Sequence, residues 1–130
     1  MILTGELLLG VEDASGRVHP ALTIPEGRRV LLTRFRWPNE PSLVGALASV
    51  ERNGNVITVR CSLHRNGSDP LGLDGNDPPS WWLGLGLGRS VRCEHHARDG
   101  GCWTAIEGEL AYLSIEPRPV WPAQRPVTTE

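Results

Sequence analysis

The chain contains no lysine, and all thirteen of its basic residues are arginine. Fifteen acidic residues outnumber them, and the net charge of −2 gives no electrostatic reason to expect nucleic acid as a partner. A GC-rich coding bias is one explanation for the arginines. The other is recognition of carboxylates at an interface, because a guanidinium group binds a carboxylate through two parallel hydrogen bonds.

The chain also lacks any run of about 18 apolar residues, so we expect no transmembrane helix and no membrane partner. Its opening residues, Met-Ile-Leu-Thr-Gly-Glu, carry no basic region of a signal peptide. The three cysteines, Cys61, Cys93 and Cys102, are odd in number, which argues against a disulfide framework. We therefore expect a protein that stays in a reducing cytoplasm, and no motif calls for a cofactor.

Helical periodicity is scarce, while fifteen Gly and eleven Pro indicate many turns. We expect one all-β domain at residues 1–123 and a loose tail at 124–130. The imperfect apolar alternation favours a small closed or partly open β-barrel of about seven or eight strands, with one or two short helical turns. The expected strands lie at residues 2–10, 17–24, 28–37, 43–52, 55–63, 89–96, 102–106 and 109–115.

Turn residues divide these strands. Asn53-Gly54 and Asp99-Gly100 each predict a tight hairpin turn. Residues 64–80 are rich in Gly, Pro and Asp and predict a long loop. Residues 81–88, Trp-Trp followed by leucines alternating with glycines, are expected to begin as a short helical turn with a smooth edge.

The last strand carries a polar residue where packing favours an apolar one. Leu110, Tyr112 and Ser114 lie on one face of it, and the other face is apolar throughout. Pro117 then ends the strand, because proline cannot donate to a ladder. The sequence thus predicts a buried strand with an inward hydroxyl at Ser114.

Several cysteines and histidines are possible zinc ligands, although no Cys-x-x-Cys pair is present. If Asp99-Gly100 is a two-residue turn, Ala97 faces Cys102 and His95 faces Thr104. His95 and Cys102 are then diagonal neighbours on one face, within reach of one metal ion. The alternative is small buried cysteines and surface histidines near a turn, with no metal.

Arginines and tryptophans are candidates for a binding surface. Arg34, Phe35, Arg36 and Trp37 interleave cations with aromatic rings, as stacking platforms for nucleic acid do, but a single such run in an acidic protein favours an edge strand with outward arginines. Trp and Arg are also enriched at protein-binding hot spots. The tryptophans either contribute to such a surface or plug the ends of a small barrel; they are Trp37, Trp81, Trp82, Trp103 and Trp121.

Two serines are candidates for a hydrolytic site. Ser90 follows the glycine-rich run, and Ser114 points inward from the closing strand. A serine needs a base to become a nucleophile. The available histidines are His19, His64, His95 and His96, and no spacing fixes any of them beside Ser90.

In their order along the chain, several segments resemble the prohead (capsid maturation) serine proteases of tailed phages, which share a β-barrel fold with the herpesvirus assemblins. The matching segments are Thr4-Gly5-Glu6 through Asp13 and Gly16, Val30-Leu31-Leu32 with Pro41 to Gly45, Asn55 to Leu63, Leu87 to Val91, and Glu109 to Pro117 with Pro119 to Ala123. The resemblance implies that Ser90 stands at the nucleophile's position and Ser114 at that of the third catalytic residue.

The family's catalytic histidine is missing from this chain. The region after Leu32 reads Thr-Arg-Phe-Arg-Trp-Pro-Asn, and no histidine occurs between His19 and His64. Without a base a serine hydroxyl is a poor nucleophile at neutral pH. The resemblance therefore implies a prohead-protease-like barrel that has lost proteolysis and lies in the virion head, or in the host cytoplasm during assembly.

Such a protein would bind the major capsid protein or another head protein as a minor capsid, decoration or assembly component. Its contact surface would be the loop at residues 64–80 with Arg34, Arg36, Trp37, Trp81, Trp82 and Trp121. Two alternatives stay open. One is an active maturation protease in which Ser90 recruits His64, His95 or His96. The other is a generic β-barrel interaction module, and a homo-oligomer is compatible with each reading.

Overall fold

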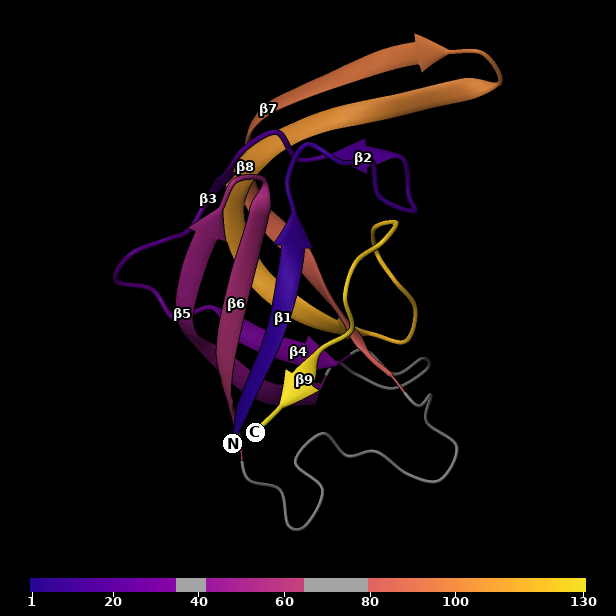
Figure 1. Cartoon of the computed structure of the whole chain (residues 1–130). Helices are drawn as coiled ribbons and strands as arrows, with labels where there is room; N and C mark the ends of the chain where they lie inside the picture. Colours follow the sequence, from indigo (N-terminus) through magenta and orange to yellow (C-terminus); the bar gives the residue numbers. More distant parts are fainter. Residues whose placement is uncertain (35–41, 65–79) are drawn as a thin grey trace.

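The computed structural model describes residues 1–34, 42–64 and 80–130, with the side chains of residues 42, 90 and 91 also outside the description. In these ranges the protein is all-β, and no helix is present that could cross a membrane. The strands form one mixed sheet (Figure 1): β1 (Ile2–Leu8), β2 (Arg17–Val18), β3 (Leu22–Thr23), β4 (Leu31–Arg34), β5 (Ser42–Asn53), β6 (Val56–Leu63), β7 (Trp82–Arg98), β8 (Gly101–Glu116) and β9 (Thr128–Thr129).

Strand β8 is the centre of the sheet. Along one edge it pairs antiparallel with β7, and along the other it pairs in turn with β2, β3 and β4, all parallel. Thr104 faces Arg17, Gly108 faces Leu22 and Leu113 faces Leu32, so the N-terminal third of the chain follows β8 along its length. Most of the sheet is therefore organised around the closing strand.

The remaining strands form an antiparallel meander. β4 pairs with β5, β5 with β6, and β6 with β1. Buried and partly exposed residues alternate along β1 and β4, as a strand with one covered face requires. The buried side chains come from most of the strands and include Leu3, Leu7, Leu32, Ile57, Val59, Leu83, Leu110 and Leu113, each fully buried.

The β5–β6 hairpin occurs where it was predicted, but its turn lies one residue later. Asn53 pairs with Val56, so the two loop residues are Gly54 and Asn55. Gly54 has a φ of 62°. Glycine at the first loop position is the pattern of a type II′ turn, which matches the twist of the flanking strands.

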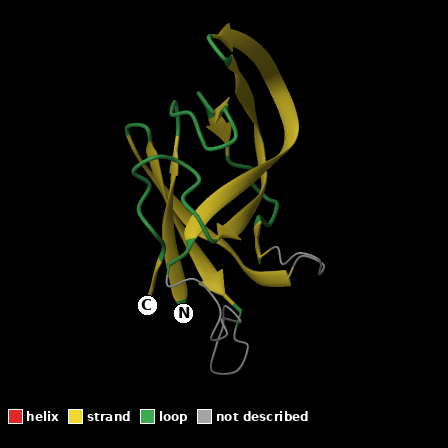
Figure 2. Ribbon diagram, turned by 90° about the vertical axis from the view of Figure 1, so that its right-hand side faces the viewer, coloured by secondary structure: helices red, strands yellow, loops and turns green. Residues whose placement is uncertain are grey.

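The β7–β8 hairpin has the predicted register at its tip. Ala97 pairs with Cys102 and His95 with Thr104. Its length was underestimated, because the helical turn expected at residues 81–88 is strand from Trp82 onward, continuous with the strand expected at 89–96. A leucine–glycine alternation has period two, which is the period of a strand. Figure 2 shows this hairpin curving as it leaves the body of the sheet.

The sheet does not close into a barrel, so the predicted barrel is not confirmed. Its ladder runs from β7 through β8, β4, β5 and β6 to β1. The C-terminal segment occupies the space between β1 and β7: Thr128 and Thr129 pair with β1, and the Val127 amide donates to the Trp81 carbonyl at 2.8 Å. Residues 124–130, expected to be loose, are thus held by both strands.

Candidate functional site: a groove beside β7

One cavity among the described residues has a volume of about 710 Å³. Three parts of the chain line it: residues 84–87 of β7, the loop at 117–121, and the N-terminal segment from Asp13 to His19. Side chains of β8, among them Tyr112, Ser114 and Glu116, complete the lining. A volume of roughly 300–1,000 Å³ is typical of ligand-binding pockets.

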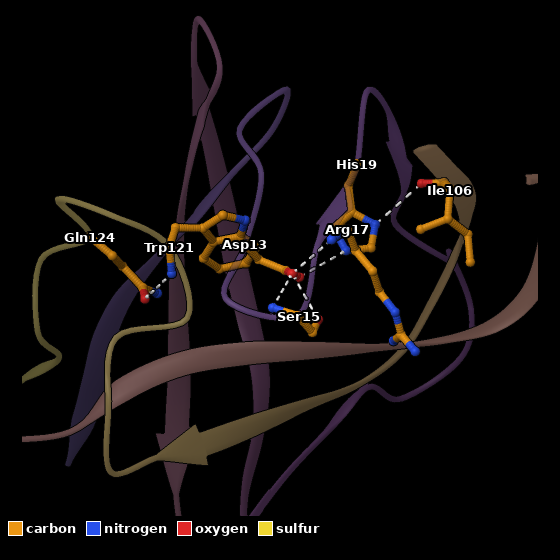
Figure 3. A network of polar contacts seen from close by, with 7 residues as sticks. All are labelled: Asp13, Ser15, Arg17, His19, Ile106, Trp121 and Gln124. Atoms are coloured by element: carbon orange, nitrogen blue, oxygen red, sulfur yellow. Dashed lines mark hydrogen bonds and ion pairs between the residues drawn. The ribbon is translucent and has the colours of Figure 1, made fainter. Parts of the chain in front are cut away.

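One wall of the groove is the polar network drawn in Figure 3. Asp13 Oδ1 accepts hydrogen bonds from the Ser15 amide at 2.9 Å, the Ser15 hydroxyl at 2.8 Å and the Arg17 amide at 3.0 Å. An Asp side chain that bonds backbone amides two and four residues ahead fixes a tight turn. This turn directs the following residues back along β8, where Arg17 pairs with Thr104.

His19 completes this wall from a buried position. Its Nδ1 lies 3.2 Å from the Ile106 carbonyl, which can only accept, so Nδ1 carries the proton. Its Nε2 lies 4.0 Å from Asp13 Oδ2. Burial lowers the pKa of His19 below 6.5, outweighing the opposite effects of the Ile106 bond and of Asp13. The sequence did not predict that Asp13 and His19 would lie together. The Asp-x-Ser-Gly pattern at residues 13–16, which is typical of a turn, was the feature that could have drawn attention to Asp13.

The floor of the groove depends on two glycines of β7. Gly84 pairs with Ser114 and Gly86 with Tyr112. A Cβ atom at Gly86 would overlap the Tyr112 ring, and one at Gly84 would lie 2.6 Å from the Ser114 hydroxyl oxygen. The absent side chains let Tyr112 and Ser114 fold across the strand. Ser114, only 3% exposed, donates to Glu116 Oε1 at 2.8 Å.

The two candidate catalytic serines are not brought together. Ser114 pairs with Gly84, whereas the Ser90 backbone pairs with Gly108. Six residues of β8 separate these positions, or about 20 Å of strand. In a triad the nucleophile and the third residue bond opposite sides of the same base, so no more than one side chain separates them. The implied pairing of Ser90 with Ser114 in one site therefore has no support in the strand register.

All the histidines lie in the described part of the chain, and each contacts another group. His95 Nδ1 lies 3.0 Å from the Thr104 hydroxyl, and His64 Nε2 lies 3.4 Å from Arg29. His96 stacks on Trp103 with ring centroids 4.1 Å apart. Among the described side chains, which do not include that of Ser90, no serine hydroxyl is a partner in these histidine contacts.

Three residues predicted for a protein-binding surface are buried. Trp121 is 1% exposed, Trp81 7% and Arg34 4%. The Arg34 guanidinium lies 4.5 Å from the centroid of the Trp81 ring. The edge strand with outward arginines is wrong for Arg34, because β4 lies between β5 and β8 and turns this residue inward. For these residues the alternative of plugging the interior fits.

The other predicted contact residues divide into two groups. Trp82 is half-buried at the start of β7. Arg36 and Trp37 lie outside the described residues, as does most of the predicted loop at 64–80. The indole Nε1 atoms of Trp81, Trp82 and Trp121 are buried and have no hydrogen-bond partner in the described part of the protein.

The candidate metal pair, His95 and Cys102, has no third or fourth ligand among the described residues. His95 and Cys102 lie on the two strands of the hairpin, as predicted, but His95 contacts Thr104 and Cys102 is exposed. Within the described ranges no three or more His, Cys, Asp or Glu side chains gather in a way that could hold a metal ion. A tetrahedral zinc site needs three or four protein ligands.

The end of the β7–β8 hairpin, which we call the arm, comprises residues 92–105. It projects beyond the rest of the sheet (Figure 1), and none of its residues is buried. It is attached near its base by the pairing of β2 with β8. Near its tip, Arg98 forms an ion pair with Glu12: Nη1 donates to Oε2 at 2.7 Å, and Nη2 lies 2.7 Å from Oε1 without a second hydrogen bond.

No protein-family model matches the chain. Comparisons with curated proteins and with solved structures likewise returned no match. The resemblance to prohead proteases thus stands on the order of the quoted segments alone.

Proposed function

We propose that this chain is a non-catalytic protein-binding component of a phage head, built on a barrel-like scaffold of the prohead-protease type. Its partner in this proposal is the major capsid protein, which it binds as a minor capsid, decoration or assembly component. The phage-head setting is taken from the sequence resemblance. The binding role is inferred from the exposed arm.

The observation that carries the binding role is the exposure of the arm. Two-stranded hairpins are only marginally stable in water unless something covers them. Here residues 92–105 have no buried member and are held by β2 and by the Arg98–Glu12 ion pair. His96 and Trp103 stack on each other across its two strands. A partner that covers this face would bury the aromatic pair and stabilise the arm.

The contacts of the candidate catalytic groups support a non-catalytic role. The Ser114 hydroxyl donates to Glu116, so a carboxylate and not an imidazole is its acceptor. His19 contacts the Ile106 carbonyl and Asp13, and neither group is a hydroxyl that it could deprotonate. Proton abstraction by a general base requires it to lie within about 3.2 Å of the hydroxyl.

A hydrolase built on Ser90 is the second candidate, and one observation favours it. Asp13 and His19 form a buried pair, and His19 reaches the carbonyl of Ile106, two residues along β8 from the partner of Ser90. The Ile106 carbonyl holds the Nδ1 proton, which leaves Nε2 as the unprotonated nitrogen that a general base needs. In this reading Ser90 is the nucleophile and His19 the base.

Co-sedimentation distinguishes the two functions. The purified chain is mixed with assembled shells of a phage major capsid protein. The capsid protein used is the one whose gene lies nearest to the gene that encodes this chain. We expect binding by the wild type and by Ser90→Ala, and at least tenfold weaker binding by the double variant His96→Ala, Trp103→Ala. Val50→Ala, an exposed change on β5, is the control. No binding by the wild type would refute the capsid role.

A fluorophosphonate probe tests the hydrolase directly. The proposed non-catalytic chain is not labelled at neutral pH. Labelling that disappears in both Ser90→Ala and His19→Asn, but persists in Ser114→Ala, would establish the second candidate instead.

A further inference from the structure

The free edge of β7, on the side away from β8, is already used by the chain itself at one end. The Trp81 carbonyl accepts from the Val127 amide at 2.8 Å, and the Leu83 carbonyl accepts from Gln124 Nε2 at 2.7 Å. Both carbonyls therefore point away from β8 toward the C-terminal segment. Backbone groups alternate in direction along a strand, so those of Leu85 point the same way, and the register then shifts between Gly86 and Leu87.

At Leu85 and Leu87 this edge carries no strand in the described part of the protein. β7 pairs there with β8 alone, on its other edge. The space beside residues 84–87 is the 710 Å³ groove. A row of outward N–H and C=O groups at an uncovered edge is a template for another extended chain. Four residues of strand span about 13 Å, the length of a short peptide segment.

The walls of the groove suit the side chains of such a segment. Tyr112 supplies aromatic surface, and Pro117 and Pro119 supply aliphatic surface. Glu116 adds a carboxylate that accepts from the Ser114 hydroxyl and forms no ion pair with another described residue. A basic side chain that reaches Glu116 beside Tyr112 would gain both a charge-assisted hydrogen bond and contact with a ring face.

We propose that the groove binds an extended peptide segment of a partner protein, which adds as a strand to the β7 edge at Leu85–Leu87 and places a basic residue against Glu116. An extended backbone is the occupant that matches donors and acceptors repeating every two residues. The C-terminal segment already makes one backbone hydrogen bond to this edge, from the Val127 amide to the Trp81 carbonyl. The inference rests on the proposed function only in that the ligand is a protein.

The test uses a phage-displayed library of random heptapeptides selected on the full-length wild-type chain. The enriched peptides are synthesised with a fluorescein label, and their binding is measured by fluorescence polarisation. Each is also made with a single N-methyl group at successive backbone amides, which removes one donor at a time without altering the protein. The protein variants are Glu116→Gln and, as a control at an exposed turn far in sequence from the groove, Glu26→Gln.

We expect peptides rich in β-branched residues with one Arg or Lys. N-methylation at alternate amides should weaken binding at least tenfold, and at the amides between them less than threefold. Glu116→Gln should weaken binding about fivefold, while Glu26→Gln leaves it unchanged. Failure to enrich any peptide, or loss of affinity without this alternation, overturns the inference.

The two proposals fail separately. If arm-dependent binding to capsid shells is seen but no heptapeptide binds, the groove proposal alone is wrong. If heptapeptides bind with the expected alternation but capsid shells do not, the proposed function is wrong and the groove proposal stands.

Discussion

The side-chain amide of Gln124 donates to the Leu83 carbonyl at 2.7 Å and so joins the C-terminal segment to β7. The same amide donates to the Glu6 carbonyl of β1 at 2.9 Å. Its oxygen accepts from the Val120 amide at 2.9 Å. One side chain, 6% exposed, thus bridges the two strands between which the sheet is not closed.

We expect Gln124→Ala to lower the free energy of unfolding by about 2–4 kcal/mol, because it leaves several buried backbone groups unpaired. Gln124→Glu should cost at least as much, since a carboxylate would face two carbonyl oxygens. Urea denaturation followed by tryptophan fluorescence measures both. Thr129→Ala, at the exposed end of the same segment, should change stability by less than about 0.5 kcal/mol. Equal losses at the two positions would contradict the bridging role.

His19 makes stability depend on pH. Burial lowers its pKa in the folded protein below the ordinary value of 6.5, so the unfolded chain takes up this proton first as the pH falls. The contribution of neutral His19 to the free energy of unfolding is fully present above pH 6.5. It decreases as the pH falls from 6.5 to the pKa of His19 in the folded protein. Denaturation midpoints between about pH 5 and 8 should show this fall.

The matched variant is His19→Asn, whose side-chain amide can still donate to the Ile106 carbonyl. We expect this variant to reduce the change of the denaturation midpoint with pH below pH 6.5, even if it lowers stability at every pH. An unchanged slope would show that other groups cause the pH dependence.

The three thiols should differ sharply in reactivity. Burial raises the pKa of Cys61 to about 12, whereas Cys93 and Cys102 are exposed. Only the thiolate reacts with iodoacetamide. At pH 8 we expect two rapid modifications per native chain and a third only after unfolding, as counted by mass spectrometry. Rapid modification of Cys61 in the native protein would contradict its position in the core.

Two glycines at close contacts should respond differently to alanine. A Cβ atom at Gly45 would overlap the backbone carbonyl of Ser62, which the β5–β6 ladder holds in place. At Gly86 it would overlap the ring of Tyr112, which is 37% exposed and can rotate away. We expect Gly45→Ala to cost about 1–3 kcal/mol and Gly86→Ala less than half as much. Thermal denaturation of both variants tests this order.

The sequence predicted those features that depend on neighbouring residues. Asp99-Gly100 placed a two-residue turn, and that turn alone fixed His95 opposite Thr104 at the end of the hairpin. The all-β class followed from the scarcity of helical periodicity. Residues 81–88 were misassigned because glycine is uncommon in strands, although the period of two was visible in the sequence.

What the sequence by itself determined, then, is local: the strands, the hairpin turns and the position of Ser114 in a buried strand. Only the tertiary structure decided that β2, β3 and β4 lie parallel on β8, that Asp13 meets His19, and that Gln124 bridges β1 and β7. The reason is that hydrophobic period and turn chemistry act between neighbours. Parallel pairing, the burial of Arg34 beside Trp81 and a groove at a strand edge depend on segments far apart in the chain.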